Sequence, residues 1–233
     1  MSVVSSDSSL TVYSAGAVAP PLQKVIALFE KSSGVRCDVR IGKPENLLAE
    51  IERSKKGDII SAGAEYVLDD AQVRGTVAAE SRISLGLRRS VIIVPNGNPK
   101  GISSLEDLCA EGVSIGIATE GCLKGLWDDV ASKARLTDRI RRNITHHADS
   151  CGAVMALINT RQVDAIFGWN AFEKIWPDSC EAIEIPANLQ VFRSTAAARI
   201  TYCSHREKAD RLLAFLLTID SKRIFSDYGW VSP

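Results

Sequence analysis

The sequence has no excess of charge of either sign and no long apolar run. Lysine and arginine together number 28, and aspartate and glutamate also number 28, so the formal net charge at pH 7 is zero. Such a chain has no global field that would attract nucleic acid or an anionic bilayer. The longest apolar stretches, for example residues 212–217, fall far short of the roughly 20 residues that a membrane-spanning helix needs. We therefore expect no nucleic-acid partner and no membrane span.

The sequence also lacks any CxxC motif, although it contains six cysteines. This absence argues against a structural zinc site and against a thioredoxin-type redox motif, and we expect neither a bound metal nor a cofactor. An even number of cysteines permits disulfides in an exported protein, but their connectivity does not follow from the sequence. The sequence is therefore compatible both with free thiols and with one or more disulfide bonds. The cysteines are Cys37, Cys109, Cys122, Cys151, Cys180 and Cys203.

The first nine residues show none of the features of an export signal. They are polar and rich in serine, without a cationic n-region or an apolar h-region. A mature exported chain whose signal peptide has been removed would look the same.

What the sequence does contain is a repeated alternation of strand and helix patterns. In the first third, strand patterns at residues 10–14, 35–41 and 58–62 are each followed by a helical pattern. Pro20 and Pro21 stand in the first turn of the first helix, where proline is favoured. This order predicts parallel strands flanked by helices, which is the α/β class.

A second series follows a long strand pattern at residues 83–94, which Arg88 and Arg89 interrupt. We expect the chain to cross to a second domain there and to return near the end. The predicted division is residues 1–84 with 197–233 in one domain and residues 85–196 in the other. The elements expected in the second series are a helix at 105–109 capped by Ser103, a strand at 113–118, a helix at 122–134, a helix at 153–160 capped by Asp149 or Ser150, and a strand at 165–169.

Three turns of small residues join a strand to a helix. They lie within residues 12–17 (VYSAGA), 115–121 (IGIATEG) and 146–152 (HHADSCG). The first N–H groups of a helix have no partner inside the helix and lie at its positive pole, so several open helix starts brought together bind an anion. The sequence thus predicts a receptor for an anion rather than a catalyst.

The order of these segments resembles the type II periplasmic solute-binding proteins of ABC transporters, and the molybdate-binding branch in particular. The resemblance begins at Leu10 and covers nearly the whole chain. It implies two Rossmann-like βα domains joined by a two-strand hinge, with a ligand cleft between them that closes by a hinge motion. It is carried by residues 10–17 (LTVYSAGA), 94–101 (VPNGNPKG), 104–108 (SLEDL), 163–169 (VDAIFGW) and 225–230 (FSDYGW).

In that family neutral donors hold a tetrahedral oxyanion, and the resemblance places the ligand-binding positions on this chain. Ala17 stands where the family has a serine hydroxyl, Pro44 falls at a second serine with Lys43 beside it, and Trp169 replaces a tyrosine. These changes favour a larger or organic anion over molybdate. The predicted ligand-binding residues are Ser14, Gly16, Ala17, Lys43, Ala62, Cys122, Lys124, Cys151 and Trp169.

Several of these residues have an ordinary alternative. Lys43 brings a positive charge to the site or is a solvated loop lysine, and Trp169 offers an indole face to a bulky ligand or closes the core. Cys122 and Cys151 bridge each other, contact a ligand thiol or a metal, or have no role.

Two adjacent histidines, His146 and His147, give the cysteines two further possible roles. With a histidine they could form a soft metal site or a Cys–His nucleophile. Neighbouring side chains in a strand point to opposite faces, so at most one of the two histidines joins such a site.

The resemblance implies an extracytoplasmic solute receptor of an ABC importer that binds a small anion and delivers it to a membrane permease. We expect a monomer without enzymatic activity, in the periplasm or outside the cell. The alternative is the ligand-sensing effector domain of a transcription regulator with the same fold.

Overall fold

The computed structural model describes residues 9–231, which form two compact units. Unit 1 combines the chain up to Gly86 with the chain from Ser194 onward, and unit 2 is Leu87–Arg193. The chain passes between the units twice, within strand β4 (Ile83–Pro95) and within strand β9 (Phe192–Arg199). No helix in the described range is both long and apolar enough to cross a bilayer.

Unit 1 is an α/β structure whose sheet has the strand order β2-β1-β3-β9. Strands β1, β2 and β3 are parallel, and β9 runs antiparallel to β3. The predicted alternation of parallel strands and helices is therefore confirmed. The elements are β1 (Leu10–Ala15), α1 (Ala19–Ser33), β2 (Cys37–Gly42), α2 (Pro44–Ser54), β3 (Ile59–Ala62), α3 (Glu65–Val73), the 3-10 turn η1 (Ala79–Ser81), α8 (Arg206–Leu216) and α9 (Ile219–Asp227).

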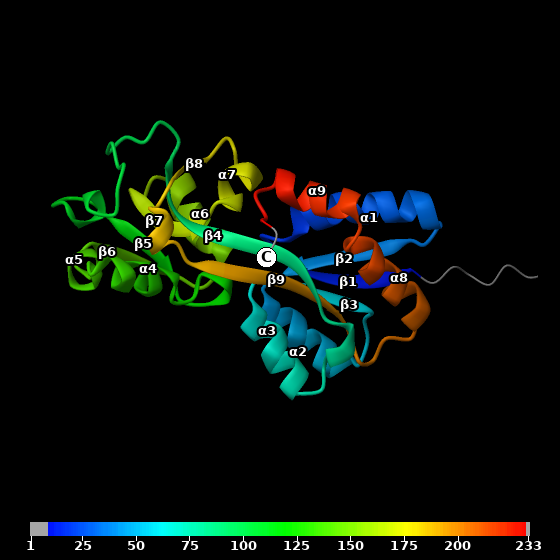
Figure 1. Ribbon diagram of the computed structural model, residues 1–233. Coiled ribbons are helices and arrows are strands. Elements are labelled where there is room, and N and C mark those ends of the chain that lie inside the picture. The colour runs from blue at the N-terminus through cyan, green and yellow to red at the C-terminus, as the bar shows by residue number, and fades with distance from the viewer. Residues whose placement is uncertain (1–8, 232–233) are drawn as a thin grey trace, which may run out of the picture. The chain divides into compact units, whose positions relative to one another are not determined.

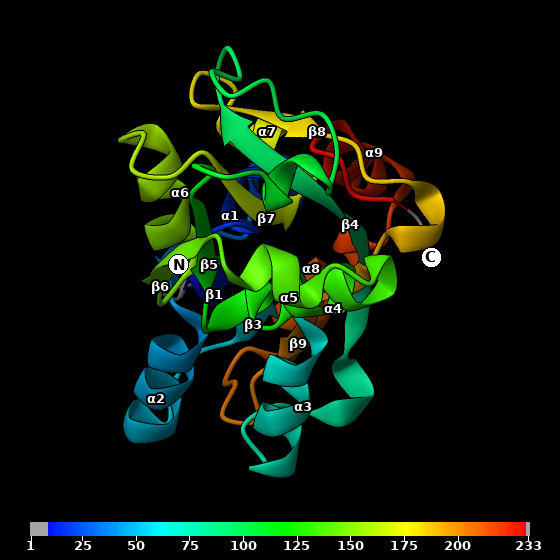
Figure 2. The same ribbon diagram turned by 90° about the vertical axis from the view of Figure 1, so that its left-hand side faces the viewer.

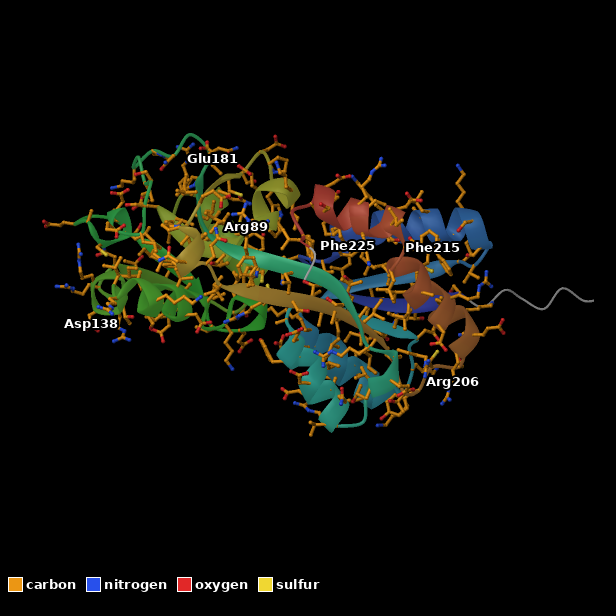
Figure 3. All side chains as sticks on the ribbon, viewed as in Figure 1. Arg89, Asp138, Glu181, Arg206, Phe215 and Phe225 are labelled. Carbon is orange, nitrogen blue, oxygen red and sulfur yellow. The ribbon has the colours of Figure 1, made fainter. Side chains whose placement is uncertain are left out.

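Helices cover both faces of the unit 1 sheet, with α1 and α9 on one face and α2 and α3 on the other (Figure 1). The terminal helices α8 and α9 pack against α1. Figure 3 shows Phe215 on α8 and Phe225 on α9. The ring of Phe215 meets Phe29 of α1 edge to face at 5.5 Å, and Phe225 meets Trp230 in the same way at 5.5 Å. The first pair joins α8 to α1, and the second packs the end of the chain against α9.

Unit 2 repeats the α/β design with the strand order β8-β4-β7-β5-β6. Strands β5, β6 and β7 are parallel, whereas β4 is antiparallel to β7 and β8. In both ribbon views α6 and α4 lie on opposite sides of β5 (Figures 1 and 2). The elements are η2 (Asp107–Cys109), β5 (Ile115–Ala118), η3 (Gly121–Leu123), α4 (Leu126–Ala134), α5 (Thr137–Arg141), β6 (Ile144–Ala148), α6 (Cys151–Asn159), β7 (Ala165–Trp169), α7 (Ala171–Ile175), β8 (Cys180–Ile183) and η4 (Ala187–Leu189).

The predicted helix at residues 122–134 is wrong in its first turn. The chain forms a short 3-10 turn, η3, and only then enters α4 at Leu126. Gly121 and Gly125 have φ angles of 66° and 72°, a left-handed conformation that an α-helix cannot contain. Gly125 thus separates Cys122 from α4, and Cys122 lies in the η3 turn that begins at Gly121.

The predicted helix at residues 105–109 is also shorter than expected, because only η2 is helical. Its start is held by the carboxylate of Asp107, which accepts hydrogen bonds from the N–H groups of Ser103 (2.8 Å) and Ser104 (2.9 Å). The hydroxyl of Ser104 in turn accepts from the N–H of Asp107 at 3.3 Å, so Ser104 and Asp107 bond reciprocally ahead of η2. The Ser103 hydroxyl donates to the same carboxylate and is not the cap.

Candidate ligand-binding site

Unit 2 brings together three residues that the sequence predicts as ligand contacts. The parallel strands β5, β6 and β7 end at the same edge of the sheet, so the segments that follow them meet there. Cys122 lies in the turn after β5, Cys151 begins α6 after β6, and Trp169 ends β7. The two sulfur atoms are 2.7 Å apart, and the Trp169 indole N–H donates to the Cys122 Sγ at 3.3 Å. All three therefore form one cluster, which we call the thiol–indole cluster.

Arg88 of β4 is a member of this cluster that sequence reasoning missed. Its side chain is fully buried, its Nη1 lies 3.7 Å from the Cys122 Sγ, and its guanidinium carbon lies 5.1 Å from the centroid of the Trp169 ring. A buried guanidinium requires compensating groups, which a thiolate and an aromatic face supply. The signal in the sequence was a charged residue inside an apolar strand. Its neighbour Arg89 points to the other face of β4 and pairs with Glu184 at the surface.

The two thiols of the cluster differ in acidity. The hydrogen bond from the Cys151 thiol lowers the pKa of Cys122 to about 6, with help from the charge of Arg88 and the Trp169 N–H and against the effect of burial. The pKa of Cys151 is raised, because its proton is held in the bond to Cys122 and its thiol is desolvated. Cys122 is therefore the more acidic thiol of the pair, and Cys151 the one that retains its proton more strongly.

The loop that carries Cys122 is fixed by Arg193. The guanidinium donates to the carbonyl oxygens of Cys122 (3.2 Å) and Lys124 (2.7 Å) and pairs with the carboxylate of Asp129 at 2.6 Å. The N–H of Lys124, which was predicted as an anion donor, donates to the carbonyl of Gly121 at 3.0 Å within the turn. The Lys124 side chain is exposed.

The third predicted helix start, that of α6, is capped and not open. The hydroxyl of Ser150 accepts a hydrogen bond from the N–H of Ala153 at 3.2 Å, so one of the free donors is already satisfied. The sequence allowed either Asp149 or Ser150 as the cap of this helix, and in the structure the cap is Ser150.

The histidines of β6 do not join the cysteines. His146 is half-buried and its Nδ1 lies 2.9 Å from the Thr145 hydroxyl, while His147 is exposed. Within residues 9–231 no group of three or more His, Cys, Asp or Glu side chains is arranged to hold a metal ion.

Unit 1 collects the remaining predicted residues at the corresponding edge of its own sheet. Gly16 and Ala17 form the turn after β1, closed by a hydrogen bond from Val18 N–H to Ala15 at 2.9 Å. Lys43 is the half-buried N-cap residue of α2, directly after β2, and Ala62 ends β3. Because β1, β2 and β3 are parallel, these three turns lie at one edge.

Ser14 belongs to the same edge, at the end of β1. It is fully buried, and its hydroxyl donates to the carbonyl of Ala15 at 3.2 Å. It is therefore already engaged within its own strand.

Two further hydroxyl groups at this edge were missed by sequence reasoning. The side chains of Ser61 and Thr195 are buried, and neither hydroxyl oxygen has a hydrogen-bond partner among the described residues. Ser61 is in register with Ser14 and with Ala197, so Thr195, two residues before Ala197 in β9, faces the same side of the sheet. A buried hydroxyl without a partner costs about 1–3 kcal/mol. Such groups are suited to bind a ligand oxygen.

The sequence profile of the bacterial extracellular solute-binding proteins matches this chain over residues 10–231. The chain belongs to this family. Its fold is that of the type II periplasmic binding proteins, as the resemblance predicted.

Solved structures of similar fold include PEB3 with bound L-phospholactate, at a TM-score of 0.85 and 23% identity over 96% of this chain and 100% of that one. Another crystal structure, that of PEB3 from Campylobacter jejuni, has a TM-score of 0.82 and 22% identity over 96% of this chain and 100% of that one. The periplasmic molybdate-binding protein of Azotobacter vinelandii has a TM-score of 0.80 and 17% identity over 96% and 99% of the two chains. Among curated sequences, an aconitate isomerase of a Pseudomonas species is 23% identical over 95% of this chain and 87% of its own length.

Proposed function

We propose that this family member is the extracytoplasmic solute receptor of an ABC importer and that it binds a small anion. The observation that carries the proposal is the pair of buried hydroxyls of Ser61 and Thr195, which lack a partner among the described residues. They lie at the edge of unit 1 where three helices begin, and helix starts favour negative charge. Neutral hydroxyl and N–H donors at such an edge are suited to an oxyanion or a carboxylate.

Lys43 extends this proposal to an organic anion. Lys43 is the N-cap residue of α2, so its side chain starts from the same edge of the sheet as the two hydroxyls. A full positive charge strengthens hydrogen bonds to carboxylate or phosphate oxygens. The L-phospholactate bound to PEB3 carries both groups, and this supports a phosphorylated or carboxylated organic anion as the ligand.

We further propose that the nine residues predicted from the sequence, together with Ser61 and Thr195, form the ligand contacts. In the type II fold such a ligand is held between two domains that close by a hinge motion. The two chain crossings within β4 and β9 are the segments that we propose as the hinge.

A panel of anions tests the ligand class. Purified protein is titrated calorimetrically with phosphate, sulfate, molybdate, L-phospholactate and aconitate, and we expect saturable binding of an organic anion. Thr195→Val and Ser61→Ala each remove one hydroxyl and should weaken that binding about 10-fold or more, since a hydrogen bond to a charged group contributes about 1.5–3 kcal/mol. Thr201→Val is the matched control, because Thr201 is exposed in the same unit. Failure of all five anions to bind would remove the anion proposal.

The importer role, the periplasmic or extracellular location and the monomeric state are parts of the same proposal. Neighbouring genes for a permease and an ATPase would support the importer. A DNA-binding segment joined to the chain would instead support a ligand-sensing domain of a transcription regulator. An assay for isomerisation of aconitate, prompted by the isomerase relative, should show no turnover if the chain is a receptor.

A further inference from the structure

We propose that Cys122 and Cys151 are a redox modification site, at which a hydroperoxide converts the two thiols into a reversible intramolecular disulfide. The six cysteines of the chain are free thiols in this structure. Nothing in the proposed receptor function requires this pair to be oxidised. Both thiols are also among the proposed ligand contacts, so oxidation is measured on the cysteines themselves and not through ligand binding.

The geometry of the pair favours bond formation. The sulfur atoms lie 2.7 Å apart. A disulfide bond is about 2.05 Å long, so the sulfur atoms need to approach by only about 0.7 Å. Cys122 lies in the short η3 turn between two left-handed glycines, and Cys151 is the first residue of α6. Cys122 is thus in a single short turn and Cys151 at the first position of its helix, so neither lies in the middle of a regular hydrogen-bond ladder that such a shift would disturb.

The surroundings of Cys122 make its sulfur the nucleophile. The guanidinium of Arg88 and the indole N–H of Trp169 both approach the sulfur, and both stabilise a thiolate. The site is buried, with Cys122 only 6% exposed and Cys151 half-buried. A small oxidant such as hydrogen peroxide is therefore favoured over a bulky disulfide.

Three other thiols, two of them buried, have the opposite environment. Cys203 donates to the carboxylate of Asp58 at 3.1 Å, and burial together with that carboxylate raises the pKa of Cys203 to about 12. Burial and nearby carboxylates also raise the pKa values of Cys37 and Cys180 to about 12. These cysteines stay protonated at neutral pH and are poor nucleophiles.

The reaction proceeds in two balanced steps. The Cys122 thiolate attacks the hydroxyl oxygen of the hydroperoxide, the O–O bond breaks, and Cys122 becomes a sulfenic acid while the alkoxide or hydroxide takes a proton from solvent. The Cys151 sulfur then attacks the sulfenic sulfur, the S–O bond breaks, and the leaving hydroxide takes the Cys151 proton to form water. Overall, the two thiols lose two electrons and one hydroperoxide is reduced. An alkyl hydroperoxide gives one alcohol and one water, and hydrogen peroxide gives two waters.

Peptide mapping after peroxide treatment tests the proposal. The full chain is treated with hydrogen peroxide, unfolded, alkylated and digested. We expect one cross-linked species that joins the peptides of Cys122 and Cys151, with the other four cysteines alkylated, and we expect a thiol reductant to reverse the link. The fluorescence of Trp169 should change in parallel, because its N–H loses a thiolate acceptor. Full alkylation of Cys122 and Cys151, or a bridge between other cysteines, would overturn the proposal.

Three variants identify the order of events. Cys151→Ala should stop the reaction at a sulfenic acid on Cys122, which dimedone traps, and Cys122→Ala should leave Cys151 unoxidised at the same peroxide concentration. Cys203→Ala, a matched buried control in unit 1, should bridge like the parent chain. Circular dichroism confirms that each variant is folded. A bridge that forms with oxidised glutathione and not with hydrogen peroxide would overturn the hydroperoxide step.

Discussion

The indole N–H of Trp169 donates a hydrogen bond to the Sγ of Cys122 across 3.3 Å. This contact joins the last residue of β7 to the turn after β5 and directs the only donor of a fully buried tryptophan at a sulfur atom. A sulfur that accepts such a bond is stabilised as a thiolate. The contact therefore links the packing of unit 2 to the chemistry of its thiol pair.

Trp169→Phe keeps an aromatic ring in the core and removes the N–H donor. We expect the pKa of Cys122 to rise from about 6 by about 1 unit, since one pKa unit corresponds to about 1.4 kcal/mol and a hydrogen bond to a charged group contributes a similar amount. The thiolate absorbance in the ultraviolet, followed against pH, measures the change. Trp127→Phe is the control, because the Trp127 ring contacts Arg141 and lies outside the cluster. Equal shifts in both variants would contradict the assignment.

The acidity of Cys122 also predicts how stability depends on pH. The pKa of Cys122 is about 6 in the folded chain and 9.0 for an ordinary cysteine, so the unfolded state binds more protons between these values. The free energy of unfolding should therefore rise between about pH 6 and 9 through this group, and this stabilisation is lost as the pH falls through 6. Urea unfolding at several pH values, in the parent chain and in Cys122→Ser, measures the difference. An identical pH dependence in both chains would show that Cys122 is not a thiolate.

Removal of the Arg193 side chain should loosen the loop that carries Cys122. Arg193→Ala eliminates hydrogen bonds to two carbonyl groups and an ion pair with Asp129, and we expect a loss of about 2 kcal/mol in the free energy of unfolding. Arg141→Ala is the matched control. Its partner Asp138 is exposed at the surface of unit 2 (Figure 3), and an exposed pair contributes under about 0.5 kcal/mol. Equal losses would show that Arg193 does not fix the loop.

The cap of α6 is tested by Ser150→Ala. The hydroxyl accepts from the N–H of Ala153, and loss of an N-cap hydrogen bond costs about 1 kcal/mol. Ser150→Gly should cost only a few tenths of a kcal/mol, because glycine is itself tolerated at this position. Thermal unfolding of the two variants gives the comparison. A larger loss for glycine than for alanine would show that the hydroxyl does not stabilise the helix start.

Much of the fold followed from the sequence because its signals are local. The strand and helix patterns that start at Leu10 and Pro20 were visible in the spacing of apolar residues, and the structure confirms β1 and α1 there. The error at Cys122 arose because apolar spacing extends across Gly121 and Gly125, whereas the backbone does not continue the helix through them. The two closely spaced glycines are the local signal for the turn that precedes the helix.

The candidate site could be predicted only in part. The turns that carry Gly16, Lys43 and Cys151 were recognisable, since each follows a strand. The surroundings of Ser61, Thr195 and Arg88 could not be predicted. Each is a single residue within a strand pattern, and whether it meets a partner depends on the side chains that other strands place beside it.

By itself the sequence determined an α/β chain, because the alternation of strand and helix is a property of neighbouring residues, and its resemblance to the solute-binding proteins implied their two-domain architecture. Only the tertiary structure decided that the sulfur atoms of Cys122 and Cys151 meet, and that Arg88 and Trp169 surround one of them. These contacts join segments that are far apart in the chain. Parallel strands bring their ends to one edge, and the packing of that edge, not the local sequence, sets which thiol is the more acidic.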